Sequence, residues 1–171
     1  MFFKTLFFIC YLLATVNAGK WRTIALNKCI GAKNNQYAEF SYPGPSRFII
    51  ALKLHHTTGK IGCAPGHKSN WGCSPPSSMN IIITDTRNKR IFPAPSLITP
   101  TTNGNWYTLP GYNSNSPSIT FAVPGFRWLY YGQIFRIWYG EDLTDYTEMT
   151  IMENLYECTR LHYMRMYIYS F

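Results

Sequence analysis

Apolar and polar side chains alternate along residues 133–139, the pattern of a β-strand whose two faces meet different surroundings. Phe135, Ile137 and Tyr139 would share one face of this strand, and an arginine and a tryptophan would share the other. A glycine and a group of acidic residues follow at once. The pattern predicts a buried strand that ends in an acidic turn.

A second clear strand is predicted at residues 47–55. Phe48, Ile50, Leu52 and Leu54 would form its apolar face, whereas the other face is mixed. A mixed second face is typical of a sheet that is covered on one side only.

Short strands separated by Gly- and Pro-rich turns account for most of the remaining chain. In the first of them Ile24 and Leu26 would share a face, and residues 86–89 would form the turn of a hairpin. These further strands are predicted at residues 21–30, 36–42, 80–85, 90–92, 106–109, 118–123 and 127–131. Many short strands at this spacing predict an all-β fold, an antiparallel β-sandwich or jelly-roll-like single domain over residues 19–171.

The C-terminal segment, residues 149–171, contains no Gly or Pro and has two interpretations. Apolar residues recur every three to four positions, and Thr150 with Glu153 would make a capping box, which favours a helix. A tyrosine-rich end in an all-β chain favours a closing strand instead. The sequence leaves both open.

Residues 1–18 have the pattern of a secretory signal peptide: a short basic start, an apolar run, and small residues before a cleavage site after Ala18. The apolar run is shorter than the roughly 20 residues that span a bilayer. We therefore expect a secreted, extracellular mature chain without a transmembrane segment.

Four cysteines remain after the signal peptide is removed, Cys29, Cys63, Cys73 and Cys158. An even number in an oxidising compartment predicts two disulfide bonds, with three possible connectivities. The pairs Cys63–Cys73 and Cys29–Cys158 are favoured, because the first closes a local loop and the second joins the first strand region to the last.

Charge is distributed unevenly along the chain. Between Gly19 and Gly140 there are thirteen Lys and Arg residues and two acids, whereas six acids and two bases follow. A cationic secreted surface attracts sulfated polyanions or anionic lipid. The alternative is that the basic body and the acidic end neutralise each other. The bases are scattered, so no dedicated nucleic-acid site is expected.

The acidic turn offers four candidate calcium ligands, Glu141, Asp142, Asp145 and Glu148. Closely spaced carboxylates suit Ca²⁺, although the spacing does not match an EF-hand. The alternative is a solvated turn or one paired with basic residues. A carboxylate pair for glycoside hydrolysis would need a separation that sequence does not reveal.

Residues that could bind zinc occur irregularly at His55, His56, Cys63, His67 and Cys73. In an exported protein the two cysteines are better explained by a disulfide. No nucleophile elbow or other catalytic motif occurs, so an enzyme is not expected and no cofactor is required.

Aromatic and amide side chains in or beside predicted loops are the candidate ligand-binding residues: Trp71, Trp106, Tyr107, Tyr112 and Asn113. Exposed aromatic faces stack on sugars or on protein partners, and neighbouring amides supply hydrogen bonds. The alternative is that these rings pack in the core. The remaining tryptophans lie within predicted strands, where core packing is more common: Trp21, Trp128 and Trp138.

Three segments, residues 83–88, 110–117 and 132–143, resemble a family of secreted β-rich extracellular domains of marine invertebrates. The resemblance covers roughly residues 29–148 and implies no particular activity. It also implies a Gly-bearing acidic turn followed by a Cys-bearing final strand, whereas residues 149–156 contain no Gly here.

Together these features predict a secreted, disulfide-braced binding module. The first hypothesis is recognition of extracellular glycans by loop aromatics, with calcium at the acidic turn. The second is a structural or adhesive matrix protein that binds neighbouring proteins.

Overall fold

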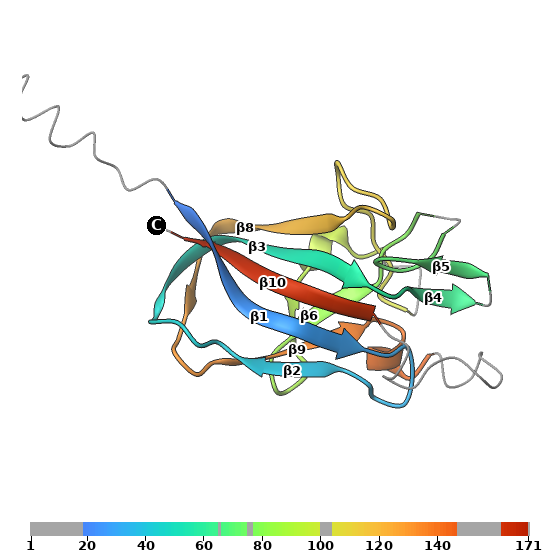
Figure 1. Ribbon diagram of the computed structural model, residues 1–171, viewed down its shortest axis with the longest axis horizontal. Coiled ribbons are helices and arrows are strands. Elements are labelled where there is room, and N and C mark those ends of the chain that lie inside the picture. The colour runs from blue at the N-terminus through green and yellow to red at the C-terminus, as the bar shows by residue number, and fades with distance from the viewer. Residues whose placement is uncertain (1–18, 65, 75–76, 100–103, 147–161, 171) are drawn as a thin grey trace, which may run out of the picture.

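The computed structural model describes residues 19–64, 66–74, 77–99, 104–146 and 162–170. They form two four-stranded antiparallel sheets that pack into a sandwich, with a small two-stranded hairpin at one end (Figure 1). The all-β sandwich predicted from the sequence is therefore confirmed. In the described part of the chain, no helix is long and apolar enough to cross a membrane.

The first sheet has the strand order β1-β10-β3-β8. Its strands are β1 (Lys20–Ile30), β10 (His162–Ser170), β3 (Arg47–Thr58) and β8 (Ser118–Leu129). The last strand lies between β1 and β3 and pairs antiparallel with both. Over residues 162–170 the closing-strand interpretation is thus correct, while residues 147–161, which carry much of the apolar helical pattern, lie outside the described residues.

The second sheet has the order β2-β9-β6-β7. Its strands are β2 (Ala38–Ser41), β9 (Ile134–Tyr139), β6 (Ile81–Thr84) and β7 (Arg90–Phe92). The β6–β7 hairpin is confirmed, and the Asp85 carboxylate stabilises its turn by accepting the backbone N–H groups of Arg87 and Lys89 at 2.9 Å each. Such a bond from an Asp to the backbone just beyond it is typical of turns.

The core lies between the two sheets. Alternating residues of β3, β8 and β10 are buried on one side, and Phe135, Ile137 and Tyr139 of β9 are buried on the other, as the alternation predicts. Phe92 and Phe121 stack across the interface with ring centroids 5.8 Å apart. Trp138, on the opposite face of β9, is also buried and packs on Tyr37 at 4.4 Å.

Two irregularities change which residues point inward. The β1–β10 pairing shifts twice between Thr23 and Lys28, so that Ile24 is buried while Leu26 is 57% exposed. The β3–β8 pairing shifts between Ile49 and Ala51. A one-residue shift moves side chains to the other face, so the predicted apolar faces of these strands were wrong at Leu26 and at the start of β3.

In β3 the shift leaves Phe48 exposed and buries Ile49 in its place. On the partner strand the same irregularity contains Gly125, which has a positive φ of 75°. Residues 118–129 form one continuous strand around this point, rather than the two strands that Pro124 and Gly125 predicted.

The predicted loop over residues 57–78 contains the two-stranded hairpin, β4 (Ile61–Ala64) and β5 (His67–Ser69). The Cys63–Cys73 disulfide joins β4 to the segment that follows β5. Cys29 is also disulfide-bonded, and Cys158 lies outside the described residues. The strand predicted at residues 106–109 is reduced to isolated bridges of Tyr107 with Met79 and Ile98.

Candidate functional site

Two of the five predicted ligand-binding residues lie in the core. Trp71 and Tyr107 are 0% and 1% exposed. The Trp71 indole N–H donates to the backbone oxygen of Ser116 at 2.6 Å, and the Tyr107 hydroxyl donates to the oxygen of Ile81 at 2.9 Å. Burial also raises the pKa of Tyr107 well above that of an exposed phenol. For these two rings the alternative of core packing describes the structure.

The other three predicted residues are nearer the surface. Trp106 and Tyr112 are partly buried against the core, and Asn113 is exposed. The Trp106 indole N–H donates to the Glu141 carboxylate at 3.0 Å, and the Asn113 side chain accepts the backbone N–H of Asn115 at 2.9 Å. These contacts stabilise loops, and the five residues do not converge on one open surface.

The first two acids after β9 are buried rather than solvated. The Asp142 carboxylate accepts the backbone N–H groups of Asn35 and Gln36 at 3.0 Å each, which holds the β1–β2 loop against the end of β9. Glu141 accepts the Trp106 indole. Burial raises the pKa of Glu141, and the hydrogen bond from Trp106 opposes this shift in part.

The other two candidate calcium ligands differ in position. Asp145 is exposed and has a left-handed backbone conformation with φ 54°. Glu148 lies outside the described residues. Across the described ranges, no group of three or more His, Cys, Asp or Glu side chains is arranged to hold a metal ion. Calcium binding at this turn stays a prediction.

The candidate zinc residues do not form one cluster. Cys63 and Cys73 are joined to each other, as expected for an exported protein. A ring nitrogen of His56 lies 2.7 Å from the backbone oxygen of Gly59. His55 points away from these residues and lies on the outer face of the first sheet, where it contributes to a different site.

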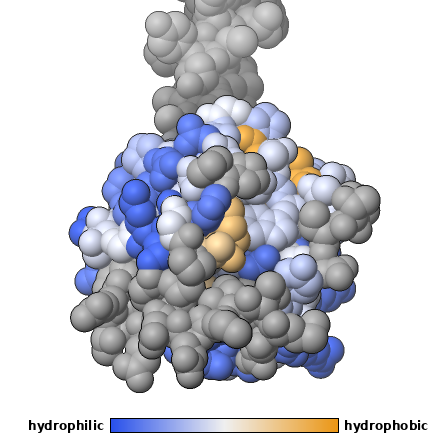
Figure 2. Space-filling model, turned by 90° about the vertical axis from the view of Figure 1, so that its right-hand side faces the viewer, coloured by the Kyte–Doolittle hydropathy of each residue, from blue (hydrophilic) through white to orange (hydrophobic). Residues whose placement is uncertain are grey.

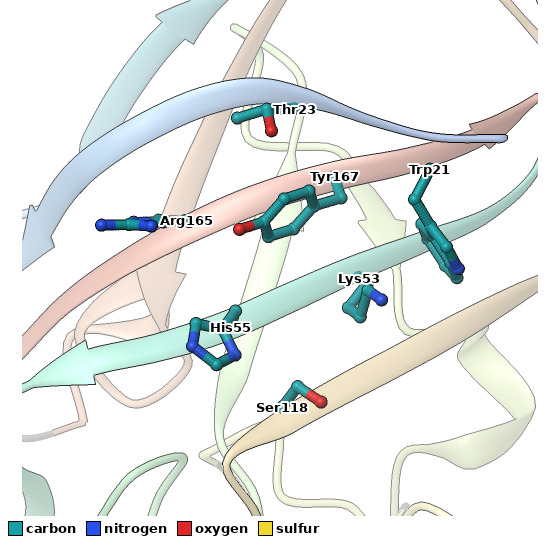
Figure 3. A pocket seen from close by; sticks show the side chains of 7 residues that line it. All are labelled: Trp21, Thr23, Lys53, His55, Ser118, Arg165 and Tyr167. Atoms are coloured by element: carbon teal, nitrogen blue, oxygen red, sulfur yellow. The ribbon is translucent and has the colours of Figure 1, made fainter.

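The outer face of the first sheet is hollowed into a trough of about 350 Å³. Its lining side chains come from all four strands of the first sheet. Figure 3 shows them projecting from the same face. Seven residues line this trough: Trp21, Thr23, Lys53, His55, Ser118, Arg165 and Tyr167. The volume lies in the range of small-ligand sites in proteins.

Strand register explains why these side chains meet. Tyr167 is paired with Thr23 on one side and with Lys53 on the other, and Arg165 is paired with His55. Directly paired residues lie roughly 5 Å apart, and alternate residues of one strand share a face. Six of the side chains therefore form two adjacent rows across the sheet, and Trp21 lies in the next row, beside Lys53.

The aromatic and basic groups of the trough contact one another. The Lys53 ammonium lies 3.9 Å from the centre of the Trp21 ring and 5.6 Å from that of Tyr167. Trp21 also packs edge-on against Tyr169 at 5.2 Å. These contacts hold one aromatic wall and one cation in fixed positions, while Trp21 stays 39% exposed.

A second exposed feature lies where β3 begins and β8 ends, away from the β4–β5 hairpin (Figure 1). Rings of Phe48 and Trp128 are 4.5 Å apart, those of Phe48 and Phe126 are 5.4 Å apart, and those of Trp128 and Tyr130 are 6.2 Å apart. Phe126 is 71% exposed and the neighbouring Tyr131 is 75% exposed. We call Phe48, Phe126, Trp128, Tyr130 and Tyr131 the aromatic cluster. From the hairpin end of the molecule, the visible described surface is by contrast mainly hydrophilic (Figure 2).

Neither exposed feature was assigned to a site from the sequence. Trp21 and Trp128 lie within strands, where core packing is the more common outcome, and both were expected inside. The alternation of Lys53 and His55 with Leu52 and Leu54 does predict which side chains of β3 leave the core. Pairing with Arg165 and Tyr167, which are more than 100 positions away, could not be seen without the sheet order.

The fold of this chain is similar to that of a known protein. No protein-family model matches the chain, and no curated protein matches it significantly. Among solved structures, it is similar to AJLec from the sea anemone Anthopleura japonica, with a TM-score of 0.72 and 24% sequence identity. The similarity covers 90% of this chain and 99% of that chain. The neighbour comes from a marine invertebrate, in agreement with the resemblance found in the sequence.

Proposed function

We propose that the protein is an extracellular glycan-binding module and that the trough is its binding site. The observation that carries the proposal is the arrangement of Trp21, Lys53 and Tyr167, which places a partly exposed aromatic ring beside hydrogen-bond donors. Sugars are bound in this manner, with a ring face stacked on an aromatic side chain and hydroxyls bonded to polar groups. The name AJLec, which suggests a lectin, agrees with this function.

The test is binding of residues 19–171 to a panel of neutral and acidic glycans, with calcium and again with a chelator. Trp21→Ala should lower affinity about tenfold or more, since it removes the stacking surface and the partner of Lys53. Trp128→Ala is a matched control, because Trp128 is 38% exposed and lies outside the trough. Equal affinities of the two variants would contradict the proposed site.

The chelator arm tests the predicted calcium ligands separately. Loss of binding on chelation, reproduced by Asp145→Ala, would support calcium at the acidic turn. Binding that is indifferent to chelator would leave the carboxylates of Glu141 and Asp142 with a structural function only. A panel without any binding, together with self-association, would favour the matrix protein instead.

The aromatic cluster favours a second candidate function, attachment to a lipid surface. Tyr and Trp rings are enriched where hydrocarbon meets water, because each has an apolar body and a polar atom. Arg47 and Arg127 lie within the same strand ends and would add attraction to anionic headgroups, each by about 1 kcal/mol.

Vesicle flotation separates this function from glycan binding. Vesicles of phosphatidylcholine with phosphatidylserine should carry the wild-type protein and the Trp21→Ala variant, but not a Phe126→Ser/Trp128→Ala double variant. On vesicles the double variant should lose binding while Trp21→Ala keeps it. On glycans Trp21→Ala should lose affinity instead. Flotation of the double variant at the wild-type level would exclude the cluster as a membrane contact.

A further inference from the structure

The basic residues of the first sheet have no acidic counterpart in that sheet. Its four strands contain seven Lys and Arg residues and no Asp or Glu: Lys20, Arg22, Lys28, Arg47, Lys53, Arg127 and Arg165. The acids of the described chain all lie on or beside the second sheet or after β9: Glu39, Asp85, Glu141, Asp142 and Asp145. The positive potential of the first sheet is therefore not neutralised locally.

Two of these cations line the trough itself. No described carboxylate lies within ion-pair distance of Lys53 or Arg165. Arg165 is paired across the strands with His55, whereas Lys53 lies in the adjacent row and extends toward Trp21 (Figure 3). The two cations therefore lie at different positions along the trough and would meet different substituents of a sugar chain.

Hydrogen-bonding capacity in the trough is also one-sided. Lys53, Arg165 and the Trp21 indole can only donate, whereas the acceptors are limited to hydroxyl oxygens and one imidazole. A neutral sugar presents hydroxyls that both donate and accept, and it would leave the two cations without a charged partner. A sulfate or carboxylate group only accepts, and charge-assisted bonds to Arg or Lys are the stronger kind.

We propose that the trough selects sugars that carry sulfate or carboxylate groups. The inference rests on the proposed glycan-binding function and names the class of ligand for the same site. A sugar ring packs beside Trp21, and its anionic substituents are bound by Lys53 at that end of the trough and by Arg165 farther along it. Ser118 and Thr23 bind the remaining hydroxyls at the two sides of the trough.

Three forms of one polysaccharide test the proposal: chondroitin sulfate, chondroitin from which the sulfates are removed, and the same chain with its carboxylates also reduced. The sulfated form should bind at least tenfold more tightly than the neutral form, and the difference should shrink as salt is added. Lys53→Gln and Arg165→Gln should each lower affinity for the sulfated chain about tenfold.

Arg87→Gln is the matched control, since it removes the same charge from the exposed turn of the β6–β7 hairpin. It should leave affinity unchanged. An equal loss in Arg87→Gln and Lys53→Gln would overturn the proposal, because attraction would then come from net charge alone. Equal binding of sulfated and neutral chains, still sensitive to Trp21→Ala, would overturn it too and leave the glycan-binding function intact. If no form binds, the selectivity is overturned, and the glycan panel decides separately whether the glycan-binding function fails as well.

Discussion

The outer face of the first sheet and the acidic end of β9 differ in what their polar residues do. The acidic end is the denser in charge along the sequence, yet Glu141 and Asp142 are 6% and 1% exposed and bind neighbouring loops. The trough is assembled from residues scattered over the whole chain, and its cations face solvent. A dense group of charges in a sequence can thus mark a place where loops are held together, and not only a place where a ligand binds.

The largest expected effect separates two tryptophans. Trp71→Ala should lower the free energy of unfolding by about 3–5 kcal/mol, because it empties a fully buried site and removes one of the two side-chain donors to the Ser116 carbonyl. Trp21→Ala should change it by less than about 1 kcal/mol, since the ring is partly exposed. Urea unfolding of both variants measures the difference. Similar stabilities would mean that Trp71 is not a core residue.

Two neighbouring aspartates give the next comparison. Asp142→Ala should cost about 2 kcal/mol, because two backbone N–H groups of the β1–β2 loop lose their acceptor. Asp145→Ala, at an exposed position, should stay within about 0.5 kcal/mol of wild type. Neither variant should alter affinity of the folded protein for a sulfated glycan in the absence of calcium. A stable Asp142→Ala protein would show that the β1–β2 loop is held by other contacts.

The smallest expected effect is a pH dependence from Glu141. Its pKa is raised by folding above the ordinary 4.5, so the folded state binds the proton more tightly than the unfolded state. The contribution to stability is complete below about pH 4.5 and declines as pH rises to the raised pKa, above which it is constant. Thermal unfolding of wild type and Glu141→Gln across this range should show the decline in wild type only. Parallel pH profiles would assign the decline to other groups.

Much of the fold could be predicted because alternation is a local property. Strand β9, the β6–β7 hairpin, the local disulfide and the all-β class each depend on residues that are close in sequence. The faces of β1 and β3 could not be predicted in full, because register shifts near Ala25 and Ile50 arise from pairing with distant strands. The same shifts leave Leu26 and Phe48 on the surface.

The candidate site was missed for a related reason. Aromatic residues in loops were predicted to bind the ligand, whereas the exposed rings of the trough lie on strands at the sheet surface. Lys53 and Arg165 look unremarkable in their own segments, and only the position of β10 between β1 and β3 brings them together. A lone basic residue in an alternating strand marks an outward position, but it does not reveal its neighbours across the sheet.

The position of β10 also sets a schedule for biosynthesis. Lys20, near the start of β1, pairs with Ser170, so β1 and β3 have no partner between them until residues 162–170 have left the ribosome. Pairings between ends so distant form slowly, and unpaired strand edges expose a growing chain to aggregation. The trough, which is lined by residues of all four strands of this sheet, forms in the same step. A nascent chain therefore gains its proposed binding surface only after β10 has emerged, and a chain that stops before residue 162 would carry none.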